Sequence, residues 1–241
     1  MGARNTLRKN SEQHKPKNTK SKVDDKRIYR AMELVIEYLK ERFPEWVGDN
    51  GDYDLKFSKE ITIEQMIGVI RQRQLRTEFD LSVIDRSIRP DGGLIALVRK
   101  NASEREYYKI VLISEIKRQG TNDEREKEGK EKQAVGNAIE RLGKNLTGIR
   151  AMLNHEAVTP FVCFGWGCDF DDSEKTVMSK LCLLNEFYPI NKTYVLKRDG
   201  DANHSRFAPV SMFFRTEQWS VDEMVKIMKE VAETTLRQYL H

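Results

Sequence analysis

The sequence predicts an α/β domain built on a mixed sheet. Two observations carry this prediction: several segments repeat apolar residues at helical spacing, and short apolar runs lie between them. Elements that alternate in this way fold as strands covered by helices. At 241 residues the chain has the length of one generous domain with a sizeable core, and no internal repeat or second core pattern is visible.

The elements of the first half follow from apolar spacing and from residues that start or stop helices. An apolar face recurs every three to four residues from Ile28, and Pro44 stops that helix. Paired Thr and Gln three residues apart have the spacing of a capping box. The expected elements are a helix over 28–43, a polar loop over 48–54, a helix opened by Thr62 and Gln65, and neighbouring strands over 94–98 and 107–117.

The second half repeats the alternation after an almost wholly charged loop. A second capping box, Ser220 with Glu223, opens the final helix, in which periodicity does not decide whether Val225 and Met228 face the core or a partner. The expected elements are a loop or excursion over 120–132, helices over 133–153 and 174–187, strands over 161–164, 194–196 and 210–214, and the final helix from Ser220.

Composition points to an intracellular, cytoplasmic protein. No apolar run approaches the length of a membrane span, and the basic N-terminus lacks the apolar region of a secretory signal. Residues 1–27 are rich in Lys and Arg with few apolar residues, so we expect a mobile arm ahead of a single domain over 28–241. The arm is either a solvated tail or a polyanion-binding segment. Cys163, Cys168 and Cys182 are interpreted as reduced thiols.

Acidic and basic side chains gather where the second of the neighbouring strands ends. Val111, Ile113, Glu115 and Lys117 alternate and should share one face of that strand, while Asp91 arrives from the preceding turn beside Gly92 and Gly93. Two carboxylates suit Mg²⁺, and Lys117 could orient or deprotonate a water or neutralise a transition state. The pattern therefore indicates a metal-dependent phosphodiesterase site. The alternative is a surface salt bridge at a strand end.

A second group of polar residues opens the helix that follows. Gly136-Asn-Ala-Ile-Glu-Arg141 places an amide, a carboxylate and a guanidinium at a helix N-terminus. Asn pairs well with adenine, Arg with guanine, and a carboxylate accepts from base amino groups. A helix N-terminus also favours nearby phosphates. The segment is thus either a DNA-reading element or an amphipathic helix with an exposed Glu–Arg pair.

These motifs together resemble the EcoRI family of type II restriction endonucleases, which belongs to the PD-(D/E)xK nucleases. The resemblance is carried, in the family's order, by Ser87-Ile-Arg-Pro-Asp-Gly-Gly93, by Val111-Leu-Ile-Ser-Glu-Ile-Lys117 with Gln119-Gly120, and by Gly136–Arg141 with Lys144-Asn145. Weaker likeness lies at 12–15, 189–191 and 234–237, so it spans most of the chain.

The resemblance implies a restriction-endonuclease-like fold, with a mixed five-stranded sheet flanked by helices and with arms that embrace DNA. It implies a Mg²⁺-dependent homodimer, in which Mn²⁺ can substitute, cutting duplex DNA at a palindrome. Asp91, Glu115 and the Ile116 carbonyl would bind the metal, and Lys117 would serve the attacking water. The implied base-reading positions are Gln119, Gln133, Ala134, Asn137, Ala138, Glu140 and Arg141.

The sequence also departs from the family pattern, which has a methionine at the position of Gln133 and two later arginines that read the outer base pairs. In the comparable segment Lys180 could replace one arginine, and Leu183 cannot replace the other. The expected site is therefore centred on AATT, with GAATTC, RAATTY, CAATTG and AATT all open, and with AATT overhangs bearing 5′-phosphates. A companion adenine methyltransferase is expected. A structure-selective nuclease and a non-catalytic basic DNA-binding protein remain as alternatives.

Overall fold

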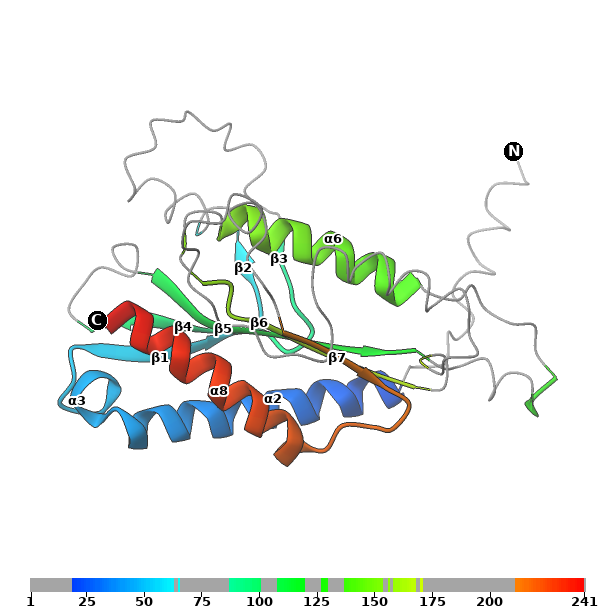
Figure 1. Ribbon diagram of the computed structural model, residues 1–241, viewed down its shortest axis with the longest axis horizontal. Helices are drawn as coiled ribbons and strands as arrows, with labels where there is room; N and C mark the ends of the chain where they lie inside the picture. The colour runs from blue at the N-terminus through cyan, green and yellow to red at the C-terminus, as the bar shows by residue number, and fades with distance from the viewer. Residues whose placement is uncertain are drawn as a thin grey trace, which may run out of the picture.

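The fold is a five-stranded sheet with helices on both faces, as a computed structural model shows (Figure 1). The structure describes residues 19–62, 65, 87–100, 108–119, 127–129, 137–153, 156, 158–167, 170 and 211–240. Within these ranges no helix is long and apolar enough to cross a membrane.

The sheet is mixed, as the sequence predicts. Its strand order is β1-β4-β5-β6-β7; β1, β4 and β5 pair antiparallel, whereas β5, β6 and β7 pair parallel. A separate antiparallel pair joins β2 (Ile61–Thr62) to β3 (Ser87–Ile88). The strands of the main sheet are β1 (Tyr53–Ser58), β4 (Leu94–Arg99), β5 (Tyr108–Arg118), β6 (Phe161–Trp166) and β7 (Ser211–Arg215).

Two layers of helices bury the two faces of the sheet. The helices α2 (Thr19–Arg42) and α8 (Val221–Leu240) pack on one face, next to the short α3 (Pro44–Val47), and α6 (Asn137–Met152) covers the other (Figure 1). Each layer has its own apolar cluster. Leu142, Leu146 and Ile149 anchor α6, which runs between the parallel strands β5 and β6. Because parallel strands need a crossover, α6 begins at the sheet edge where β5 ends.

Several expected elements are confirmed. The helix expected over 28–43 is α2, which begins nine residues earlier, at Thr19, and ends at Arg42. Residues 19–27, expected as part of the arm, therefore belong to this helix. Pro44 follows the end of α2, as expected, and is also the first residue of α3. The strands expected over 94–98, 107–117, 161–164 and 210–214 are β4, β5, β6 and β7, and the helix expected over 133–153 is α6.

Both predicted capping boxes form. The Thr62 amide donates to Gln65 Oε1 at 2.8 Å and the Gln65 amide donates to Thr62 Oγ1 at 3.1 Å. At the start of α8, the amides of Ser220 and Glu223 make the same reciprocal pair of bonds, at 2.9 and 3.2 Å. In α8, Val225 and Met228 are buried in the cluster beneath α2, so they face the core.

The prediction of a polar loop over 48–54 is wrong at its end, because β1 begins at Tyr53. Among the described strands, this one lies at the sheet edge and pairs only with β4. Leu55 is its one fully buried residue, and Lys56 and Phe57 are exposed. A single buried position gives no alternating apolar pattern, so pairing with β4 defines this strand more than its own sequence does.

The expectation that Val111 shares a face with Ile113, Glu115 and Lys117 is also wrong. In the pairing of β4 with β5, Ile95 faces Leu112 while its neighbour Ala96 faces Ile110, so Val111 is an extra residue. Such a β-bulge reverses the alternation. Val111 therefore packs beneath α2 and α8, whereas Ile113 packs beneath α6.

Other expectations fall outside the described residues: the arm up to residue 18, the helix through Ile70, most of 120–132, the helix over 174–187 and the strand over 194–196. Of the three cysteines, Cys163 is a buried free thiol in β6, and Cys168 and Cys182 lie outside the described ranges.

Candidate active site

The turn before β4 holds Asp91 against the end of β5. The amide of Gly92 donates to the Ser114 carbonyl at 3.0 Å, and the Ser114 amide donates to the Gly93 carbonyl at 3.0 Å. Gly93 has φ +74°, a conformation that favours glycine, and a Cβ on Gly92 would lie 2.1 Å from Ser114 Oγ. The two glycines thus allow the close approach that brings Asp91 to the sheet.

Glu115 lies fully buried at the centre of this contact. Its side chain is 0% exposed, and its Oε2 accepts a hydrogen bond of 3.0 Å from the Asp91 backbone amide. Its Oε1 accepts one of 3.0 Å from Nδ2 of Asn145 in α6. The buried carboxylate is therefore fixed by two different elements, because a buried charge needs hydrogen-bond partners.

Lys117 joins the two acidic side chains. Its Nζ lies 2.5 Å from Asp91 Oδ2 and 2.5 Å from Glu115 Oε1. The Asp91 side chain is 39% exposed, whereas that of Lys117 is 13% exposed, so the cluster opens to solvent on the Asp91 side. The structure thus brings together the three residues that the sequence nominates for catalysis.

The charges of this cluster perturb one another. Burial raises the pKa of Glu115, an effect that the Lys117 ammonium opposes and the Asp91 carboxylate reinforces. Burial would lower the pKa of Lys117, but the charges and hydrogen bonds of Glu115 and Asp91 outweigh it and raise that pKa. Lys117 is consequently a cation at neutral pH in this arrangement.

The donor set fits a hard divalent cation. Two carboxylates converge on one point, and a positive group, the Lys117 ammonium, already lies between them. Among the residues that the structure describes, no cluster of three or more His, Cys, Asp or Glu side chains is arranged for a metal. A two-carboxylate site suits Mg²⁺, which retains several of its waters.

The predicted reading residues are described in part. Glu140 and Arg141 are exposed in the first turns of α6. Gln119 follows β5, and its backbone amide donates to the Trp166 carbonyl at 2.9 Å. Asn137 and Ala138 lie in α6, but their side chains fall outside the description, as do Gln133, Ala134 and Lys180 altogether. The edge of the sheet where β5 ends therefore carries both the acidic cluster and the start of α6.

Two residues near the cluster were not nominated from the sequence. Asn145 bonds Glu115 from α6. Asp25 in α2 has its pKa raised by burial and by the charges of Asp91 and Asp24, which indicates that α2 also contributes charge near this site. The Asn145 position was visible only as part of the family likeness, and nothing in the local sequence around Asp25 indicates its placement.

A mixed five-stranded sheet, with Asp91 beside a Glu-x-Lys strand end, defines a protein of the restriction-endonuclease-like class. Comparison with known proteins narrows the class. Residues 14–180 match the family described as restriction endonuclease EcoRI. The chain belongs to this EcoRI family of type II restriction endonucleases, which are site-specific deoxyribonucleases.

Individual relatives agree with the family match. The chain is 28% identical to the type II restriction enzyme RsrI of Cereibacter sphaeroides over 233 residues, which cover 84% of this chain and 80% of that enzyme. It is 25% identical to the type II restriction enzyme EcoRI of Escherichia coli over 190 residues, covering 65% of this chain and 66% of that enzyme.

Proposed function

We propose that this restriction endonuclease is a Mg²⁺-dependent homodimer that cuts duplex DNA at a palindrome centred on AATT. The observation that carries the proposal is the convergence of Asp91, Glu115 and Lys117 at the sheet edge where α6 begins. The family membership adds the reaction class. The outer base pairs, as in GAATTC, RAATTY or CAATTG, are left to the experiment below.

In this proposal Asp91, Glu115 and the Ile116 backbone carbonyl hold the metal. A bound Mg²⁺ would lower the pKa of a water and neutralise charge that develops on the phosphate. Lys117, kept cationic by its two carboxylate neighbours, acts as a donor to the attacking water or to the phosphate oxygens. The Asp91 side chain is more exposed than that of Glu115, so Asp91 is assigned to the side of the site that the scissile phosphate approaches.

Sequence reading is assigned to α6 and its approach. Asn137, Glu140 and Arg141 contact the adenines of AATT, with Ala134 and Ala138 against base edges and Gln119 near thymine. Gln133 lies beside this group, and Lys180 is the candidate contact to an outer base. Glu140 and Arg141 are exposed on the first turns of α6, so both side chains are accessible to the edges of DNA bases.

A palindromic site requires two identical readers, so the proposal includes a twofold-symmetric dimer in which each subunit cuts one strand. Cleavage before AATT on both strands leaves overhangs with 5′-phosphates. An N6-methyl group on adenine would remove a donor hydrogen from the Asn137 contact and block cutting. A companion adenine methyltransferase would therefore protect the host DNA.

The test is a digest of a plasmid of known sequence with the full-length protein and Mg²⁺, followed by sequencing of the fragment ends. Discrete fragments with AATT overhangs are expected, and the flanking bases identify the outer pairs. Fragment ends without a consensus would favour a structure-selective nuclease. Retained DNA binding without cutting, in either Mg²⁺ or Mn²⁺, would favour a non-catalytic binder.

An Arg141→Ala variant tests the reading element in the same assay. Loss of one base contact should weaken cognate binding by about 1–3 kcal/mol and admit sites that differ from the cognate at one position. Equal weakening on all DNA sequences would instead assign Arg141 to the phosphate backbone, and the recognition part of the proposal would be wrong.

A further inference from the structure

One side chain of the helix assigned to DNA reading is bonded directly to the buried glutamate of the active site. Asn145 Nδ2 donates to Glu115 Oε1 at 3.0 Å, across 30 residues of sequence. The contact satisfies part of the hydrogen-bonding need of the buried Glu115 carboxylate. It also makes the position of that carboxylate depend on the position of α6.

The hydrogen bonds of Glu115 come from three separate parts of the chain. The turn supplies the Asp91 amide to Oε2, β5 itself supplies Lys117 to Oε1, and α6 supplies Asn145 to the same Oε1. Two bonds to one oxygen and one to the other fix the plane of a carboxylate that is 0% exposed. Of these three donors, only the Asn145 amide belongs to a helix that extends toward DNA-reading positions.

The helix α6 links the two ends of this contact rigidly. Positions 137, 141 and 145 are successive steps of four residues, so they form one row along the helix. Arg141 is exposed one turn before Asn145, and Leu142 and Leu146 are buried beside it. A shift or rotation of α6 that accompanies engagement of Arg141 would be carried to Asn145 by the helix backbone.

We propose that Asn145 is a positioning residue through which α6 sets the orientation of Glu115, so that the chemical step becomes fast only when α6 is correctly seated on DNA. This inference rests on the proposed function, because it assumes that α6 reads the DNA. It assigns to Asn145 the regulation of the site and no direct contact with reacting atoms.

The side chains of Asn and Asp are both planar and nearly equal in size, so Asn145→Asp is the most informative substitution. Asn145→Asp keeps the size and shape of the side chain but replaces the amide donor with an acceptor that faces the Glu115 carboxylate. Asn145→Gln keeps the amide donor on a longer side chain and serves as the conservative variant. Asn50→Asp is the matched control, because it makes the same chemical change at an exposed turn remote from the site.

The experiment measures single-turnover cleavage with Mg²⁺, and the Kd for DNA without divalent cation, on two duplexes. One duplex carries the cognate site found in the plasmid digest, and the other differs from it at one base pair. For Asn145→Asp, the cognate cleavage rate should fall about 10- to 100-fold, the effect of losing a hydrogen bond to a charged group. The cognate Kd should change by less than about threefold.

The ratio of cognate to altered-site cleavage is the readout that a merely structural role would not move. The altered site does not seat α6 correctly, so its slow cleavage should fall much less than cognate cleavage, and the ratio should shrink. Asn145→Gln should recover part of the cognate rate, and Asn50→Asp should behave as the natural chain. Thermal unfolding of each variant identifies any that fail to fold, in which case Asn145→Ser, which keeps a donor hydroxyl, and Asn145→Ala form the comparison.

Three results would overturn the inference. Wild-type cleavage by Asn145→Asp would show that Glu115 does not depend on the amide. A Kd raised in proportion to the lost rate would assign Asn145 to DNA contact, and an equal fall on both duplexes would remove the link to recognition. The proposed function survives each of these, whereas failure of the natural chain to cut any site would overturn both.

Discussion

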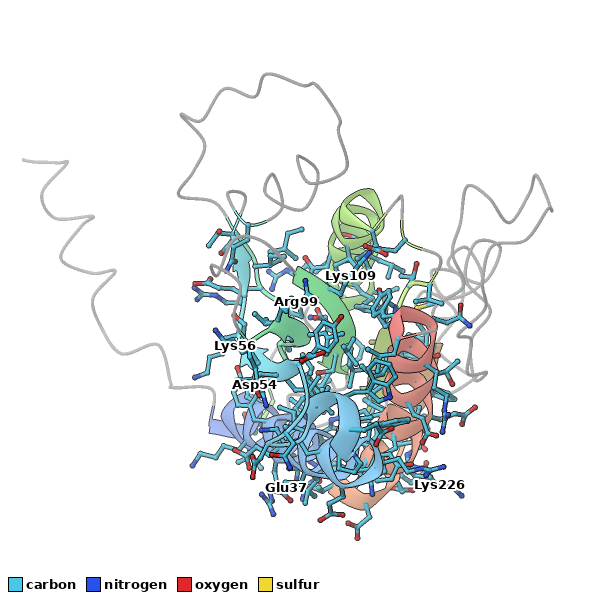
Figure 2. The ribbon with its side chains drawn as sticks, turned by 90° about the vertical axis from the view of Figure 1, so that its left-hand side faces the viewer. Glu37, Asp54, Lys56, Arg99, Lys109 and Lys226 are labelled. Atoms are coloured by element: carbon cyan, nitrogen blue, oxygen red, sulfur yellow. The ribbon has the colours of Figure 1, made fainter. Side chains whose placement is uncertain are left out.

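The strand β5 carries a lysine–carboxylate contact at each end, and the two contacts differ in charge balance. Near its start, Lys109 Nζ binds both oxygens of Glu156, each at 3.0 Å (Figure 2 views this end of the molecule). At its far end, Lys117 lies 2.5 Å from each of two carboxylates. The first contact is one positive and one negative charge, while the second is one positive and two negative charges, a net of −1.

This difference agrees with the proposal that the second contact serves chemistry, whereas the first supports the fold. In the contact between Lys109 and Glu156, the buried carboxylate, whose side chain is 6% exposed, has a cation against both of its oxygens. The unbalanced cluster instead holds a buried glutamate whose pKa is raised mainly by burial and further by Asp91. Such an arrangement works against stability, and it is expected where a protein must receive a further cation.

The largest expected effect comes from the unbalanced end. Lys117→Ala should lower cleavage of cognate DNA by about 100- to 1,000-fold or more, because it removes the charged donor that the proposed function assigns to the attacking water or to the phosphate oxygens. Specific DNA binding without divalent cation should remain, because no reading residue is altered. Single-turnover cleavage and a Kd on the same duplex measure the two effects.

Robust cutting by Lys117→Ala would mean that Asp91 and Glu115 suffice, and the role assigned to Lys117 would be wrong. Loss of binding together with cutting would instead indicate that the variant has lost its fold. Thermal unfolding with and without Mg²⁺ distinguishes these cases, since a cation that binds only the folded state raises the unfolding temperature.

The convergence at Lys117 shows how far the sequence could predict the site. Alternation along β5 holds from Ile113 to Lys117, beyond the bulge, so Glu115 and Lys117 could be placed on one face. Asp91 could be placed near them because it lies in the turn directly before β4, the strand that neighbours β5. These are local relations, which short-range patterns record.

The remaining features depend on packing between distant segments. The bulge at Val111 depends on how β5 pairs with β4. The edge strand β1 likewise depends on its backbone hydrogen bonds to β4. Asn145 reaches Glu115 because Leu142, Leu146 and Ile149 fix how α6 sits on the sheet. Asp25 approaches the cluster only through the packing of α2. These contacts join residues that are far apart in the chain, so local sequence patterns could not predict them.

The balanced end supplies the matched variant and the second prediction. Lys109→Ala makes the same substitution on the same strand, and it removes the ion-pair partner of the buried Glu156. The free energy of unfolding should fall by about 1–3 kcal/mol, because the removal leaves a charge on the buried Glu156 without this partner, while the 27% exposure of Lys109 weakens the pair relative to a fully buried one. Cleavage at a temperature where the variant is folded should match the natural chain.

Urea unfolding and single-turnover cleavage together measure this result. An unchanged unfolding free energy would place the Lys109–Glu156 pair among surface contacts of little worth. A large fall in the cleavage rate of folded Lys109→Ala would mean that the contacts at the two ends of β5 are not separate in role.

A third contact, balanced like that of Lys109 but exposed, should give the smallest effect. Arg215 Nη1 and Nη2 bind the Glu223 carboxylate at 2.8 and 2.7 Å, and these bonds, followed by those of Ser220, lower the pKa of Glu223 to about 2. A carboxyl group whose pKa is lowered by folding stabilises the folded protein at pH values above its ordinary pKa of 4.5. This stabilisation is lost as the pH falls toward 2. Glu223→Gln keeps a capping-box residue but removes the charge. With the Glu223 side chain 45% exposed, solvent screens the pair, so the loss at neutral pH should be about 0.5 kcal/mol.

The pH dependence makes this small effect measurable. Urea unfolding of the natural chain and of Glu223→Gln should differ at pH 6, and the difference should shrink between about pH 4.5 and pH 2 as Glu223 takes up a proton in both the folded and unfolded states. Glu230→Gln makes the same change at an exposed position of α8 and is the control. A difference that stays constant over this range would assign the effect to helix capping alone. A loss of stability as large as that of Lys109→Ala would contradict the expectation that an exposed ion pair contributes less than one with a buried carboxylate.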